Sequence, residues 1–148
     1  KQFDIVIAKD VIEHIYRDLE FIENISRCVK EGGRLILSTQ NKFSLNYLIE
    51  GTAYKLFRPS KKWMGWDRTH LRFYTPFSLT KILNSNGFTS FVYSSVYIFP
   101  YYIINLLTAG KVKIELSFLK YFDLLLGHVF PFNRMGWNII VRATKRLS

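Results

Sequence analysis

The chain has 148 residues, of which 49% are hydrophobic and 22% are charged, which fits one domain with a sizeable core and excludes wholesale disorder. Its 21 Lys and Arg residues outnumber the 11 Asp and Glu residues, and the net charge of +10 favours anionic partners: nucleic acid, an acidic membrane surface or phosphorylated substrates. A single cysteine, Cys28, excludes an internal disulfide framework and a cysteine-rich zinc site, and the simplest location is a reducing compartment such as the cytoplasm.

The first forty residues predict a strand, a helix and a second strand. Residues 3–8 are β-branched and mostly apolar, which is typical of a strand buried on both faces in a parallel sheet. Asp18 suits the N-cap of a helix that ends at Gly32 and Gly33, and residues 34–39 predict the next strand. The apolar stripe of this helix comprises Leu19, Phe21, Ile22, Ile25, Cys28 and Val29. The two strands should be parallel, with a right-handed crossover.

The rest of the chain predicts a less regular stretch and then alternating elements. Residues 40–75 have no clear period, and Thr75 with Pro76 marks the start of a helix that Asn86 and Gly87 end. The apolar face of this helix comprises Phe77, Leu79, Ile82 and Leu83. A strand over 88–99, helices over 101–108 and 114–126, and a last strand over 137–143 follow.

Three ionisable residues follow the first predicted strand: Asp10, Glu13 and His14. Ligands of an open parallel sheet bind beyond the carboxyl ends of its strands, so a binding site is expected here. Motifs this short also occur by chance. The alternative, in which Asp10 caps a turn and the other two side chains face solvent, stays open.

Four segments combine in a specific order: residues 3–7 (FDIVI), 10–15 (DVIEHI), 29–41 (VKEGGRLILSTQN) and 69–75 (THLRFYT). In order and spacing they resemble class I S-adenosylmethionine-dependent methyltransferases, of the type 11/23 subgroup that is ubiquinone-biosynthesis-like. The resemblance implies an α/β fold with a Rossmann-like methyltransferase sheet. Residues 1–148 would be the C-terminal part of one such domain.

On this resemblance, the chain holds the fourth to seventh strands of a seven-stranded sheet. The last strand would be antiparallel and inserted near the sheet edge, and residues 100–133 would form an insertion before it. The chain also begins without a methionine and enters a strand almost at once, which favours a piece of a longer protein.

The resemblance implies S-adenosylmethionine as the cofactor. Ala8, Lys9 and Asp10 would line it, with Val11 close beside them. The family's glycine-rich turn after the first strand is absent, because Gly32 and Gly33 are predicted to end a helix. We therefore expect this chain alone to be inactive, while the full-length protein transfers a methyl group to a small-molecule or lipid-linked acceptor.

Two histidines are the candidate catalytic residues. The resemblance places His14 near the transferred methyl group or the acceptor, where a base can remove the proton of an acceptor hydroxyl. His70 is the second candidate, although a hydrogen-bonded loop histidine is the plainer interpretation. We predict no metal site, because Glu13 and His14 are adjacent instead of four residues apart and no further cluster is evident.

Two other functions compete with methyl transfer. A non-catalytic subunit could bind a partner chain through an exposed sheet edge. A peripheral membrane-binding module could place the aromatic and aliphatic residues of 100–131 on an anionic membrane surface. Basic residues also mix with tryptophans over 58–72, but a solvated basic face is favoured there over nucleic-acid binding.

Overall fold

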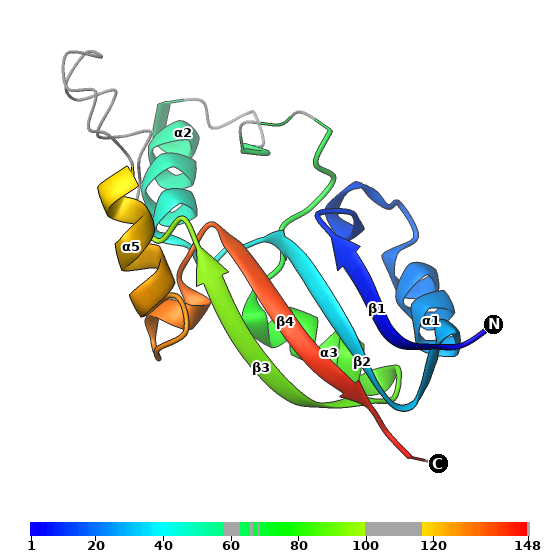
Figure 1. Cartoon of the computed structure of the whole chain (residues 1–148). Coiled ribbons are helices and arrows are strands. Elements are labelled where there is room, and N and C mark those ends of the chain that lie inside the picture. Colours follow the sequence, from blue (N-terminus) through cyan, green and yellow to red (C-terminus); the bar gives the residue numbers. More distant parts are fainter. Residues whose placement is uncertain (58–62, 66, 68, 100–116, 148) are drawn as a thin grey trace.

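The computed structural model describes residues 1–57, 63–65, 67, 69–99 and 117–147. They contain one four-stranded sheet in the spatial order β1 (Phe3–Lys9), β2 (Val29–Gln40), β4 (Asn138–Lys145), β3 (Phe88–Val96). β1 and β2 are parallel, and β4 runs antiparallel to both of its neighbours, as Figure 1 shows. The expected α/β class, the parallel first pair and the inserted antiparallel last strand are confirmed.

Two helices cover the core side of the sheet. α1 (Asp18–Cys28) packs on β1 and β2, α3 (Pro76–Ser85) packs on β3, and the two helices contact each other. Between helices and sheet lies one apolar cluster, in which side chains from every strand interdigitate. Its fully buried members include Ile22, Leu35, Leu37, Leu79, Leu83, Phe88, Ile139 and Val141. This burial is the main favourable term in folding the sheet.

β1 differs from its predicted environment. We expected burial on both faces, but Phe3, Ile5 and Ile7 are 50%, 55% and 67% exposed, while Ala8 is buried. The reason is the strand order: β1 is an outer strand, with β2 as its one partner among the described residues. β1 therefore has more apolar surface than the described residues bury.

The junction between α1 and β2 also corrects the prediction. The helix ends at Cys28 and β2 begins at Val29, so Gly32 and Gly33 lie inside the strand instead of stopping the helix. Glycine is required at position 33, because a Cβ there would lie 2.8 Å from the carbonyl oxygen of Lys30 and 3.0 Å from that of Asp4. Cys28, expected in the core, is exposed.

The N-termini of α1 and α3 differ in how they are capped. Asp18 is the first residue of α1, not its N-cap, which is Arg17. α3 begins as predicted: Thr75 accepts a hydrogen bond from the Ser78 amide, and the Ser78 side chain accepts one from the Thr75 amide. Each predicted apolar stripe includes a residue that is exposed instead of buried. Leu19 on α1 is 61% exposed, and Phe77 on α3 is 80% exposed.

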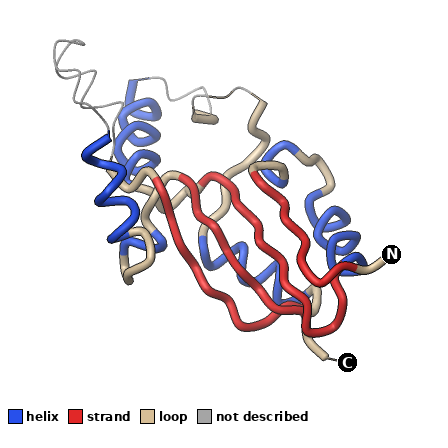
Figure 2. Tube along the Cα trace, in the orientation of Figure 1, coloured by secondary structure: helices blue, strands red, loops and turns tan. Residues whose placement is uncertain are grey.

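The connections hold short helices. The stretch between β2 and α3, predicted as irregular, contains a π-helical turn η2 (Tyr47–Gly51) that continues into α2 (Thr52–Phe57), which Figure 2 shows as one helical rod. The predicted helix over 101–108 lies outside the described residues, whereas α5 (Ser117–Leu126) falls within the predicted 114–126. Among the described helices none is long and apolar enough to cross a membrane.

The capping box of α3 provides a direct test of this local analysis. Thr75→Ala should lower the free energy of unfolding by about 1 kcal/mol, because the Ser78 amide loses its acceptor at the helix start. Urea unfolding followed by circular dichroism measures the change. Ser85→Ala, at the exposed end of the same helix, is the matched control and should be near neutral. Equal effects of the two substitutions would contradict the capping assignment.

Candidate functional site

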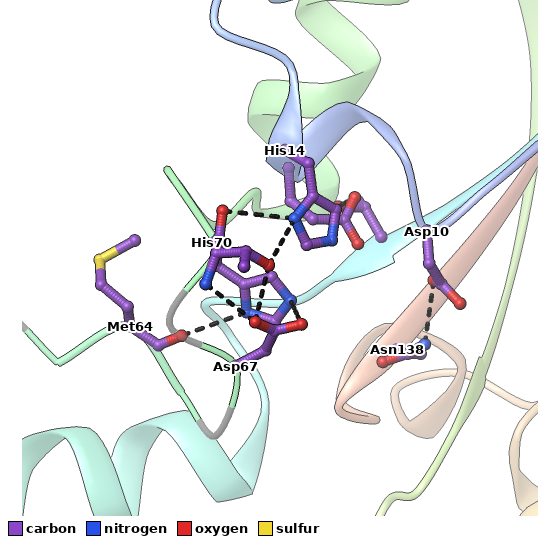
Figure 3. Close-up of polar contacts among 9 residues, drawn as sticks. Asp10, His14, Met64, Asp67, His70 and Asn138 are labelled. Carbon is purple, nitrogen blue, oxygen red and sulfur yellow. Dashed lines mark hydrogen bonds and ion pairs between the residues drawn. The ribbon is translucent and has the colours of Figure 1, made fainter.

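Three side chains from distant parts of the sequence meet beyond the carboxyl end of β1. Glu13 and His14 lie in the 3-10 turn η1 (Ile12–His14), and His70 lies in the segment that leads to α3. One possible ligand atom from each of the three falls within 4.8 Å of the others, and the two imidazole centroids are 4.9 Å apart. Figure 3 shows the rings of His14 and His70 facing each other. Glu13 is fully buried and His70 is 7% exposed, while His14 is accessible to solvent.

The surroundings of His14 fix its tautomer. Its Nδ1 lies 3.3 Å from the carbonyl oxygen of Thr69 and 3.0 Å from Thr69 Oγ1. The Thr69 hydroxyl already donates to Asp67 Oδ1 at 2.6 Å, so both atoms of Thr69 can only accept from the imidazole. Nδ1 therefore carries the proton, and the Nε2 lone pair is left for a substrate or a metal.

His70 is oriented in the same way. Its Nδ1 lies 3.1 Å from the carbonyl oxygen of Met64, which is an acceptor, so Nδ1 is again protonated. Its Nε2 lies 3.9 Å from Asp67 Oδ2. Hydrogen bonds from Thr69 lower the pKa of Asp67, which keeps this carboxylate ionised beside both imidazoles. Imidazoles oriented through Nδ1 by an outer shell of oxygen atoms are typical of metal-binding and proton-transferring histidines.

Glu13 is the buried member of the cluster. Its Oε2 accepts a hydrogen bond from Thr39 at 2.9 Å, whereas Oε1 is buried without a hydrogen-bond partner. Burial raises the pKa of Glu13 above its ordinary value. An unpartnered buried carboxylate oxygen is costly unless a ligand satisfies it. The alternative in which Glu13 merely faces solvent is wrong.

The acidic residue Asp10 stays apart from the cluster. Asp10 Oδ1 accepts hydrogen bonds from Ser38 Oγ and Asn138 Nδ2, at 2.9 and 3.1 Å, which bind the turn after β1 to β2 and β4 (Figure 3). Asp10 adopts φ = 50°, a left-handed conformation that is uncommon outside glycine and concentrates at functional sites. This arrangement combines a cap-like role with a position at the sheet edge where ligands bind.

The other residues predicted to line a cofactor surround this turn. Ala8 is buried in the core cluster, Lys9 is exposed, and Val11 is 37% exposed. The side chains of Lys9, Asp10 and Val11 therefore reach the surface, whereas that of Ala8 packs into the core. The small side chain of Ala8 instead lets β1 pack closely on its neighbours.

A cluster of aromatic rings lies beside His70. The ring of Phe73 lies 5.9 Å from His70 and is in edge contact with Trp137 at 5.6 Å and with Tyr47 at 5.0 Å. Trp63 stacks on Phe73 with an interplanar angle of 9°. This aromatic wall packs against His70 and helps to hold it in place.

A polar network holds the segment 69–74 over the start of α1. Asp18 pairs with Arg72 and accepts a hydrogen bond from the Tyr74 hydroxyl at 2.7 Å. Arg72 also donates to the carbonyl oxygen of Tyr16 at 2.8 Å. Burial raises the pKa of Asp18, but the hydrogen bonds from Arg72 and Tyr74 outweigh it and leave the pKa below its ordinary value. We call these contacts of Asp18 with Arg72 and Tyr74 the Asp18 clamp. They hold the segment that contains His70.

Sequence reasoning proposed His14 and His70 separately but missed their pairing with Glu13, and missed Thr69 and Asp67 altogether. The Thr–His pair at 69–70 and the aspartate two residues before it were visible in the sequence. No local period could show that this loop returns to η1. The hydrogen bond from the Leu71 amide to the carbonyl oxygen of Glu13 provides that information.

Comparisons with known proteins identify the family of this chain. A family model described as "Methyltransferase domain" matches residues 1–91. Ubiquinone biosynthesis O-methyltransferases are similar over part of the chain: that of Dictyostelium discoideum is 35% identical over 89 residues, or 59% of this chain and 26% of its own length. The human protein is 37% identical over 86 residues, or 57% of this chain and 22% of its own length. The matched segment is thus about a quarter of these relatives.

Solved structures support the fold. A SAM-dependent methyltransferase from Thermotoga maritima aligns with 98% of this chain and 57% of its own, with a TM-score of 0.60 and 14% identity. One from Archaeoglobus fulgidus aligns with 98% of this chain and 60% of its own, with a TM-score of 0.57 and 17% identity. The four strands therefore form part of a Rossmann-like methyltransferase sheet.

The tautomers can be read directly by NMR. In ¹⁵N-labelled protein, long-range ¹H–¹⁵N correlation at about pH 8.5 should show His14 and His70 as neutral imidazoles protonated on Nδ1. The exposed His128 serves as an internal reference. A proton on Nε2 of either His14 or His70 would contradict the hydrogen-bond assignment.

The Asp18 clamp predicts a dependence of stability on pH. Because its folded-state pKa is lowered, Asp18 stabilises the fold above its unfolded pKa, and this contribution disappears as the pH falls through the folded value. The difference in unfolding free energy between the wild type and Asp18→Asn should be constant above about pH 5 and shrink below about pH 4. Glu20→Gln, which removes an exposed ion pair with Arg17, is the control with little effect. A difference that persists to low pH would rule out the charged clamp.

Proposed function

Since this chain belongs to the methyltransferase domain family, we propose that it forms the acceptor side of an enzyme that transfers a methyl group from S-adenosylmethionine to an oxygen of a small-molecule or lipid-linked acceptor. One observation carries the proposal: Glu13, His14 and His70 meet at the carboxyl end of β1, with both imidazoles oriented through Nδ1 and with an unpartnered carboxylate oxygen. This is the side of an α/β sheet where ligands bind. The cluster can accept a proton from, or orient, a hydroxyl.

The donor set suits a divalent cation. Two imidazole nitrogens and one carboxylate oxygen are ligands that Zn²⁺, Mn²⁺ and Fe²⁺ accept in sites that keep open positions. The outer shell already orients both rings, and burial of Glu13 Oε1 leaves a cost that a cation would remove. When bound, a cation would lower the pKa of a coordinated acceptor hydroxyl.

A second candidate assigns the same chemistry to His14 alone. Its Nε2 could take the acceptor proton as a general base, with Asp67 stabilising the imidazolium through Thr69. His70 would then position the acceptor and not bind a metal. The solvent-accessible side of His14 favours this role, while the unsatisfied Glu13 oxygen favours the cation.

The wall beside His70 supports an aromatic acceptor. Phe73 lies 5.9 Å from the His70 ring, and Trp63 and Trp137 pack behind it. The relatives are named for O-methylation in ubiquinone biosynthesis, so a hydroxyl on a ring that carries a lipid tail is the acceptor class we propose. Stacking would hold the ring while the hydroxyl reaches the cluster.

The cofactor side of the site is incomplete within this segment. Lys9, Asp10 and Val11 could contribute one wall for S-adenosylmethionine, and Ala8 supports them from the core. We place the glycine-rich turn of the family outside these 148 residues, in a part of the enzyme that would cover the exposed apolar face of β1. A separate partner subunit at this strand is the alternative to a continuous chain.

Metal titration separates the two mechanisms. Calorimetry with Zn²⁺ and Mn²⁺ at about pH 7.5 should show one site, and His70→Ala should weaken it by about 100-fold, because one of three ligands is lost. Glu13→Gln should have a comparable effect. His128→Ala, which removes the histidine outside the cluster, is the matched control and should bind as the wild type does. Absence of binding, with His70→Ala still folded, would leave the general-base mechanism.

A further inference from the structure

An apolar strip runs along the outer side of α5 and the turn after it. Its members are more than half exposed: Tyr121 67%, Leu124 66%, Leu125 71%, Val129 53% and Phe130 72%. Positions 121, 124 and 125 share one helix face, so the first three side chains form a continuous surface. We call these five residues the α5 strip.

The orientation of α5 is fixed by polar contacts, with the apolar residues turned outward. Asp123 is buried, and its carboxylate accepts the backbone N–H groups of Tyr97 and Ile98 at 2.9 and 3.0 Å. The Ser95 amide donates to the carbonyl oxygen of Gly127 at 2.8 Å. Rotating the helix to bury its leucines would leave the Asp123 carboxylate and these strand groups unpaired, which is costly. The exposed strip is therefore built into the fold.

The charge around the α5 strip favours an anionic partner surface. Asp123 is the one acidic residue in the segment 117–137, and it points inward, so this segment presents no carboxylate beside the strip. Arg134 is exposed, and its guanidinium carbon lies 5.9 Å from the Phe130 ring. The net charge of +10 opposes pairing of two copies and attracts an anionic surface.

We propose that the α5 strip docks on an anionic lipid bilayer, with its leucines and aromatic rings in the headgroup region and Arg134 on lipid phosphates. An apolar helix face with aromatic residues and flanking cations is typical of shallow interfacial binding. α5 packs on β3, at the edge of the sheet opposite β1, so a chain segment or subunit paired with β1 would leave the strip open (Figure 1). The docking does not depend on methyl transfer.

The test is co-flotation with vesicles. The protein should bind phosphatidylcholine vesicles that contain about 30% phosphatidylglycerol and bind pure phosphatidylcholine much less. Leu124→Gln with Leu125→Gln should reduce the bound fraction by about tenfold or more. Leu19→Gln with Phe77→Gln, two exposed apolar residues on α1 and α3, is the matched control and should bind as the wild type does. Circular dichroism confirms that each variant folds.

Arg134→Gln tests the electrostatic part, and it should reduce binding at about 0.1 M NaCl more than at about 0.5 M. Three results would overturn the proposal. They are equal binding to both vesicle types, unchanged binding of the α5 double variant, and concentration-dependent self-association that this variant abolishes. The last result would show that a second copy covers the strip.

Discussion

The arrangement of the site depends on one crossing of the chain. The segment 70–74 runs over the turn that follows β1 and is held by backbone hydrogen bonds at both ends. The Leu71 amide donates to the carbonyl oxygen of Glu13 at 2.9 Å, and the Tyr74 amide donates to that of Gln40 at 3.2 Å. We call the segment 70–74 the strap. Because the strap is hydrogen-bonded to both η1 and β2, it brings His70 next to Glu13 and His14. The Asp18 clamp and the aromatic wall are built on this strap.

The strap also explains how much could be predicted from the sequence. The β–α–β pattern and the start of α3 follow from local periods and capping residues, whereas the antiparallel last strand follows from the family resemblance, and all three are confirmed. The same local information misplaced the end of α1, because glycine pairs stop helices more often than they sit inside strands. Within β2, position 33 has to be glycine because the backbone oxygens of Lys30 and Asp4 leave no room for a Cβ atom. Non-local contacts decide such positions.

The candidate site was predictable in its parts but not in its assembly. His14 follows the carboxyl end of a predicted strand, which marks it as a candidate site residue from sequence alone. His70 became comparable only when the hydrogen bond from the Leu71 amide to the Glu13 carbonyl oxygen showed that its loop reaches η1. For β1 the sequence predicted burial that the structure does not show. Its residues are apolar, but the described chain does not supply the surface that would bury them.

The strap has a consequence for local unfolding. Loops that carry functional histidines often open independently of the sheet, but here the amides of Leu71 and Tyr74 are bonded to η1 and β2. Releasing His70 requires breaking contacts to the most buried part of the fold, including the Tyr74 side chain, which is 3% exposed. The histidine segment should therefore exchange its amide hydrogens together with the central sheet, as one cooperative unit. Ligand entry on the side of His14 needs no such opening, because the His14 side chain is accessible to solvent.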